Sequence, residues 1–63
     1  MPHATADLLT RLLESGERNI GDIDSHIASE APNTSNQLLL LRSIQRTYVN
    51  VCEQLREALR EYE

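Results

Sequence analysis

The stretch LRSIQRTYVNVCEQLREALREY, residues 41–62, decides the fold, because its apolar residues recur at helical spacing. Seven positions separated by alternating steps of three and four form the main stripe: Leu41, Ile44, Tyr48, Val51, Leu55, Ala58 and Tyr62. Leu38, Cys52 and Leu59 widen this stripe along one side. Heptad spacing is typical of a helix that packs lengthwise against another helix. We therefore expect the stripe to face a second helix.

The residues before this stretch predict where its helix begins. Pro32 pushes the residue before it out of the helical region, so an earlier helix should end there. Thr34 and Gln37 have the spacing of a capping box, in which the hydroxyl of the first accepts from the amide of the second. We predict a helix from about residue 34 to about residue 61.

The first half of the chain carries a second stripe at the same spacing. It consists of Leu9, Leu13, Gly16, Ile20, Ile23 and Ile27. Thr5 is the expected N-cap, with Asp7 close to the positive end of the helix. Gly16 and Gly21 each disfavour a helix by about 1 kcal/mol relative to alanine. The register favours one helix over about residues 5–30, and two shorter helices with a break near Gly16–Gly21 are the alternative.

Two helices of nearly equal length joined by residues 31–33 predict an all-α fold, an antiparallel two-helix hairpin that forms a single domain over residues 1–63. Counting outward from the turn places Gly16 near Tyr48 or Val51, where a glycine leaves room for the ring. The hairpin is expected to pair into a larger helical bundle, because small domains need a staple and a single cysteine, Cys52, allows no internal disulfide.

Composition narrows the classes of function. The net charge of −4 argues against general binding to nucleic acid or to an anionic membrane, since both depend on a basic surface. The N-terminus has no basic stretch followed by an apolar run, and the longest apolar run is Leu38–Leu41. A cytoplasmic protein is expected.

Apolar residues outside the two stripes are the main functional clue. Leu38–Leu41 pass all the way round a helix, so Leu39 and Leu40 cannot both face the partner helix. Exposed apolar patches usually mark interfaces. We predict a partner-binding surface made of Leu8, Leu12, Leu39, Leu40 and Val49. Its partner would be another protein, a second copy of the chain, or both; alternatively, Leu39 and Leu40 pack on the N-terminal residues of their own chain.

Residues with catalytic or ligating chemistry are few. Asp22 and His26 share a helix face, but two ligands without a third are a weak metal site, and a solvated face explains them better. Ser25 has no Gly-rich elbow or oxyanion hole near it. We expect no enzyme activity, no metal and no cofactor.

A second hypothesis is a small helix-turn-helix transcriptional regulator that binds DNA. Residues 20–31 would form its first helix and residues 35–46 its recognition helix, with Asn36, Gln37, Arg42 and Arg46 facing bases or phosphates. The leucines at 38–41 leave few polar positions for the groove, so nucleic acid is the less favoured partner.

The segment APNTSNQLLLL, residues 31–41, resembles the polar, Pro-containing turn and Leu-rich second helix of the small E-type co-chaperones of type III secretion needle subunits. These are short, acidic helical hairpins. The resemblance covers the architecture of most of the chain, although the Tyr-Gln pairing of that turn and a small-residue-rich second helix are missing here. It implies a helical-repeat chaperone as partner and a needle protein as client.

Overall fold

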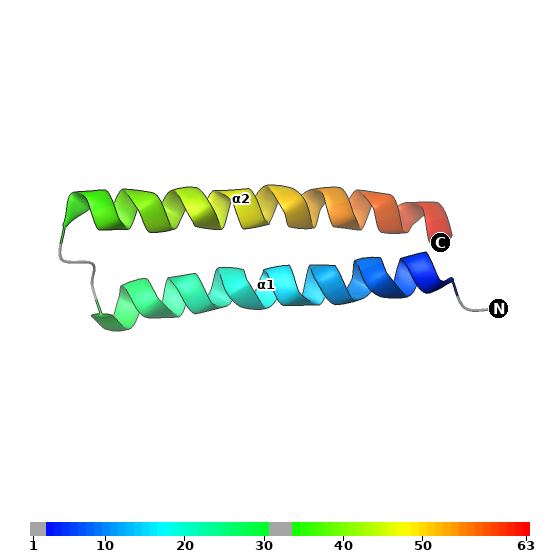
Figure 1. The fold of residues 1–63 in the computed structure, drawn as a ribbon, viewed down its shortest axis with the longest axis horizontal. Helices are drawn as coiled ribbons and strands as arrows, with labels where there is room; N and C mark the ends of the chain where they lie inside the picture. The colour runs from blue at the N-terminus through cyan, green and yellow to red at the C-terminus, as the bar shows by residue number, and fades with distance from the viewer. Residues whose placement is uncertain (1–2, 31–33) are drawn as a thin grey trace.

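A computed structural model describes residues 3–30 and 34–63, and it consists of two long antiparallel helices. Helix α1 spans Ala4–Glu30, α2 spans Ser35–Leu59, and a short 3₁₀ turn, η1, covers Arg60–Tyr62. Figure 1 shows α1 and α2 side by side, with both chain ends at the same end of the molecule. The predicted all-α hairpin is confirmed. The turn expected at residues 31–33 lies outside the described residues.

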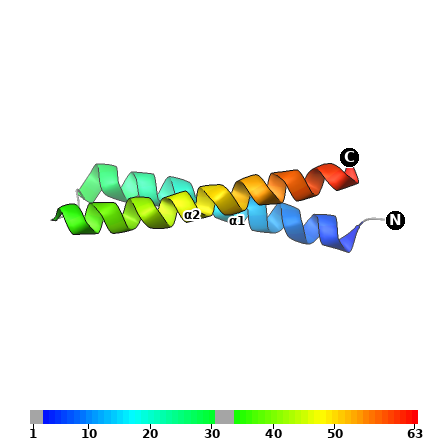
Figure 2. The ribbon, with the colours of Figure 1, turned by 90° about the horizontal axis from the view of Figure 1, so that it is seen from above.

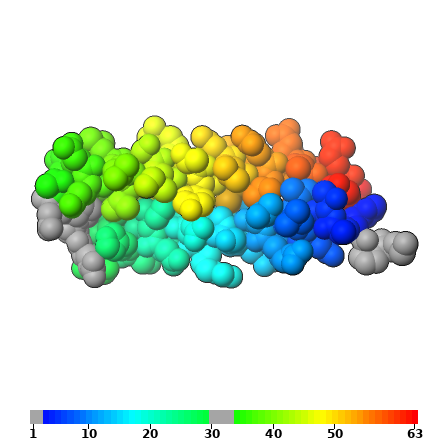
Figure 3. All heavy atoms as spheres, in the orientation of Figure 1, coloured from blue at the N-terminus to red at the C-terminus, as the bar shows by residue number. Residues whose placement is uncertain are grey.

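The molecule is a rod. Its principal extents are 50 × 16 × 13 Å and its radius of gyration is 14.6 Å, whereas a compact domain of this length would have a radius of roughly 11 Å. The helices cross at a shallow angle (Figure 2) and remain packed along their whole length (Figure 3). In the described chain neither helix is apolar enough over a sufficient length to cross a membrane.

Helix α1 runs unbroken through both of its glycines, so the continuous helix is correct and the break near Gly16–Gly21 is not formed. Its start differs from the prediction by one residue. The helix begins at Ala4, and the amide of Asp7 donates to the carbonyl of His3 at 3.0 Å. Thr5 therefore lies inside the first turn, and its prediction as the N-cap is wrong.

The start of α2 follows its capping signal. Thr34 has an extended backbone, and its hydroxyl accepts from the amide of Gln37 at 3.1 Å, as predicted. At the opposite end of the rod, the rings of His3 and Tyr62 lie 5.1 Å apart and tilted, which brings the two ends of the hairpin together. The Thr34 cap therefore sets where α2 begins, and the ring contact joins the C-terminal end of the hairpin to the start of α1.

The rotation of α2 about its own axis differs from the prediction. Ile44 and Val51, expected to face α1, are 42% and 43% exposed. Cys52 is instead 1% exposed and Gln45 is partly buried. The inward positions are thus Leu41, Gln45, Tyr48, Cys52, Leu55 and Leu59, which also alternate by steps of four and three. The predicted register, with Ile44 and Val51 facing α1, and the observed register, with Gln45 and Cys52 facing α1, both have heptad spacing. The helix adopts the second, although it turns a polar glutamine toward α1.

A close approach between Gly16 and Cys52 explains this rotation. Gly16 is buried, and a Cβ built on it would lie 2.7 Å from the Cys52 sulfur. Real Cβ atoms essentially never come that close to another heavy atom. The thiol therefore occupies the space that a side chain at position 16 would need. Gly21, by contrast, is exposed and has no neighbour within 4 Å of a built Cβ.

We expect Gly16→Ala to lower the free energy of unfolding by about 1 kcal/mol. Overpacking at a closed site costs about 1–3 kcal/mol and the better helix propensity of alanine returns about 1 kcal/mol. The measurement is urea unfolding followed by circular dichroism at one protein concentration.

Gly21→Ala is the matched control, and it should raise the free energy of unfolding by about 0.4–1 kcal/mol because nothing obstructs the new methyl group. Adding Cys52→Ala to Gly16→Ala should recover part of the loss. Equal stabilisation by both glycine substitutions would show that the two helices do not meet at Gly16.

Candidate interaction surface

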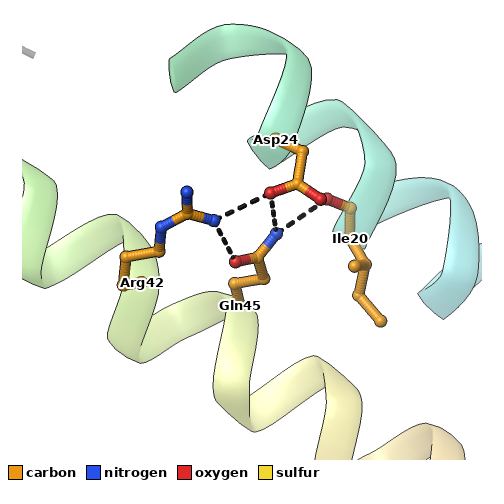
Figure 4. A network of polar contacts seen from close by, with 4 residues as sticks. All are labelled: Ile20, Asp24, Arg42 and Gln45. Carbon is orange, nitrogen blue, oxygen red and sulfur yellow. Dashed lines mark hydrogen bonds and ion pairs between the residues drawn. The ribbon is translucent and has the colours of Figure 1, made fainter. Parts of the chain in front are cut away.

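A network of polar side chains joins the helices along one edge of the hairpin (Figure 4). The Gln45 amide donates to the Ile20 carbonyl at 3.1 Å and to Asp24 Oδ1 at 2.8 Å. Arg42 Nη1 donates to the same Asp24 oxygen at 2.8 Å and to Gln45 Oε1 at 2.7 Å. Gln45 therefore uses both its amide nitrogen and its oxygen, which allows a polar side chain to sit between two helices.

The charge of Asp24 is stabilised by this network. Hydrogen bonds from Gln45 and from Arg42 lower the pKa of Asp24 below its usual value of 3.8, since both donors favour the ionised carboxylate. Nearer the chain ends, Arg56 Nη2 donates to Glu17 Oε2 at 3.2 Å, again between α2 and α1. We call these five residues, Glu17, Asp24, Arg42, Gln45 and Arg56, the polar edge.

The other edge of the hairpin is a shallow apolar groove. It encloses about 210 Å³ where the helices leave space beside Gly16. Its lining residues come from both helices: Leu12, Ser15, Gly16, Asn19, Tyr48, Val51 and Leu55. The expected proximity of Gly16 to Tyr48 and Val51 is therefore met, although Cys52 makes the closest approach.

Helix geometry places the groove opposite the polar edge. Residues two apart on a helix point in nearly opposite directions, because each residue turns by about 100°. Ser15 of the groove is two residues from Glu17, and Ile44 is two residues from Arg42. One edge of the hairpin is thus closed by hydrogen bonds, and the other presents hydrocarbon.

Exposed apolar side chains continue the groove in both directions. On α2, Leu40 and Ile44 precede Tyr48 and Val51 at helical spacing, and on α1 Leu8 precedes Leu12 by one turn. All of these except Tyr48, which is half-buried, are exposed. We call this set the apolar strip: Leu8, Leu12, Leu40, Ile44, Tyr48 and Val51.

The predicted partner-binding residues divide between faces. Leu8, Leu12 and Leu40 belong to the apolar strip. Leu39 is 67% exposed but lies two residues before the inward-facing Leu41, so it points away from α1. Val49 lies four residues after Gln45, on the side of the polar edge.

The alternative in which Leu39 and Leu40 pack on their own N-terminal residues is wrong, because they are 67% and 61% exposed.

Sequence reasoning missed Ile44 and Val51 as surface residues because it assigned them to the helix contact. The signal was present in the second register, where Gln45 and Cys52 stand one heptad apart on the inward face. The small Cys52 opposite Gly16 is a matched pair, and a valine at that point would not fit the space that the thiol fills.

Other candidate residues do not gather into a metal site in the part of the chain that the structure describes. Asp22 and His26 are both exposed on α1, and among residues 3–30 and 34–63 no three His, Cys, Asp or Glu side chains are grouped as a metal site requires. Arg42, assigned to DNA in the second hypothesis, already donates to Asp24 and Gln45.

The fold and surface define a helical hairpin with one polar edge and one apolar strip. No protein-family model matches the chain, and neither a curated protein nor a solved structure is significantly similar to it.

We expect Asp24→Asn to remove a stabilising contribution that depends on pH. The folded-state pKa of Asp24 is lowered, so its contribution is fully present above the usual value of 3.8 and is lost as the pH falls through the lowered pKa. The difference in free energy of unfolding between wild type and variant should therefore be largest at neutral pH and shrink in acid.

Urea unfolding at several pH values measures this difference. Asp22→Asn is the control, because it removes a carboxylate two residues away that is not part of the polar edge. A difference for Asp24→Asn that stays constant from neutral pH into acid would show that the carboxylate charge contributes nothing to the network.

Proposed function

We propose that this chain is a non-enzymatic protein–protein interaction module that binds through its apolar strip. The observation that carries the proposal is the asymmetry of the hairpin. Hydrogen bonds and ion pairs close the polar edge, whereas large aliphatic side chains stand exposed along the opposite edge. A contiguous apolar surface on a small protein usually marks a binding site.

The surface area of the chain supports this proposal. The accessible surface is 5015 Å², about 900 Å² more than the ~4,100 Å² expected for a monomer of 7.2 kDa. A standard protein interface buries about 800 Å² on each partner. The excess is therefore of the size that one docked partner would cover.

The small number of buried side chains also supports a role in protein binding. Among the described residues the buried apolar side chains are Cys52 and Leu55, a very small core for a folded domain. Chains of this size usually gain stability from a disulfide, a metal or a second chain. A partner on the apolar strip would supply the burial that two helices cannot provide alone.

The role in the cell would be that of an adaptor, a co-chaperone or a small inhibitor, in the cytoplasm. The partner is a second copy or a helix of another protein, since a groove between two helices accepts an amphipathic helix. The resemblance to needle-subunit co-chaperones suggests a helical-repeat chaperone. DNA binding stays a prediction.

Photo-crosslinking in the cells that make the protein tests this function. A photoreactive amino acid at Leu12 or Val51 should give covalent protein adducts, because both positions lie in the groove. The same amino acid at Leu39 is the control, since that position is more exposed but points away from α1. An absence of adducts at Leu12 and Val51, or equal yields at Leu39, would contradict the proposal.

A further inference from the structure

We infer that the occupant of the apolar strip is a second copy of this chain, turned end to end about a two-fold axis to form an antiparallel four-helix bundle. This inference rests on the proposed function, because it names the partner of the same surface. Its support comes from the spacing of the strip, from its charge and from the position of the groove.

The steps between successive apolar residues on the groove side of α2 are the same whether they are counted from the N-terminal or from the C-terminal end of the helix. The groove-side row reads Leu40, Ile44, Tyr48, Val51, Leu55 and Leu59, with steps of four, four, three, four and four. A two-fold axis between positions 48 and 51 matches each of these residues with an apolar residue of the other copy. Leu40 lies level with the partner's Leu59, Ile44 with the partner's Leu55, and Tyr48 with the partner's Val51. Leu55 is buried against α1 but lines the groove, and Leu59 is half-buried, so both contact the partner only along the inner side of the groove. Self-matching of this kind is what an interface between identical surfaces requires.

The same axis also matches α1 with α1. Gly16 lies level with Cys52, so the midpoint of positions 48 and 51 lies level with residues 18 and 19 of α1. Rotation about this point places Asn19, a half-buried residue of the groove, beside the partner's Asn19. Ser15 then lies level with the partner's Asp22, so its hydroxyl can donate to that carboxylate.

The scarcity of charged residues on the groove side allows a second copy of this acidic chain to bind there. The chain carries −4 overall, so contact between two acidic surfaces would be unfavourable. Among the described side chains, the groove-side row of α2 has no charged residue, and the matching row of α1 has only Asp22 and His26, at its turn end. A basic partner would find almost no carboxylate to pair with, whereas two copies can dock without bringing their acidic residues together.

The test measures the mass of the purified full-length chain by sedimentation equilibrium over a range of concentrations, with circular dichroism to verify helicity. Wild type should approach twice 7.2 kDa. Leu40→Glu should weaken association at least tenfold. Leu39→Glu is the matched control, because Leu39 is adjacent to Leu40, slightly more exposed and outside the strip, and this variant should associate like wild type.

Crosslinking tests the direction of the two copies without a charged substitution. In a Cys52→Ala background, Val51→Cys places two thiols about 4.5 Å apart along the bundle, and Leu40→Cys places them about 28 Å apart, at ~1.5 Å per residue. A short bis-maleimide should link the first pair and not the second. The reverse yield would overturn the antiparallel arrangement.

A monomeric wild type at all concentrations would overturn the inference, and so would equal weakening by Leu39→Glu and Leu40→Glu. Failure of the inference and failure of the proposed function are distinguishable. If the purified chain is monomeric but Leu12 and Val51 give photo-adducts in cells, the strip binds a foreign protein. If those positions also give no adducts, the proposed function fails with the inference.

Discussion

The contact between Gly16 and Cys52 sets the rotation of α2, and the rest of the surface follows from that rotation. A buried glycine lets the thiol approach α1 to a distance at which no Cβ would fit. Two turns of α2 are thereby held with Cys52 and Gln45 inward, and Gln45 completes its hydrogen bonds with Ile20 and Asp24. Side chains adjacent to these positions must then turn outward, which is why Ile44 and Val51 are exposed.

With Gln45 and Cys52 facing α1, the hairpin buries less aliphatic surface, but its helices are held in one register. A glutamine between two helices contributes less burial than an isoleucine, but it has a defined set of partners and therefore specifies how the helices slide and rotate. Ile44 and Val51, which this register excludes from the contact with α1, lie on the same side of α2. They gather on the edge opposite the hydrogen bonds, beside the hollow that Gly16, Ser15 and Asn19 leave. The small core and the exposed strip are thus two consequences of one contact.

Much of the fold was readable from the sequence. The capping residue Thr34, the register of α1 and the approximate ends of both helices follow from local rules that neighbouring residues determine. The rotation of α2 was not readable, because two heptad registers fit the same stretch and apolar content favoured the wrong one. Choosing between them requires knowing that Gly16 and Cys52 meet, which is a contact between distant residues. The sequence predicts Leu8, Leu12 and Leu40 as surface residues because they lie outside both stripes. It does not predict Ile44 and Val51, because they belong to the register that the helix does not adopt.

The most direct test of the central claim is a nuclear Overhauser measurement on the isotope-labelled full-length chain. We expect strong cross-peaks from the Gly16 α-protons to the Cys52 β-protons, and from the Gln45 side-chain amide protons to α1 near Ile20 and Asp24. Cross-peaks from Gly16 to the Val51 methyl groups, with none to Cys52, would show that α2 is turned the other way. The apolar strip would then lie inside the hairpin, and the surface proposed for recognition would not exist.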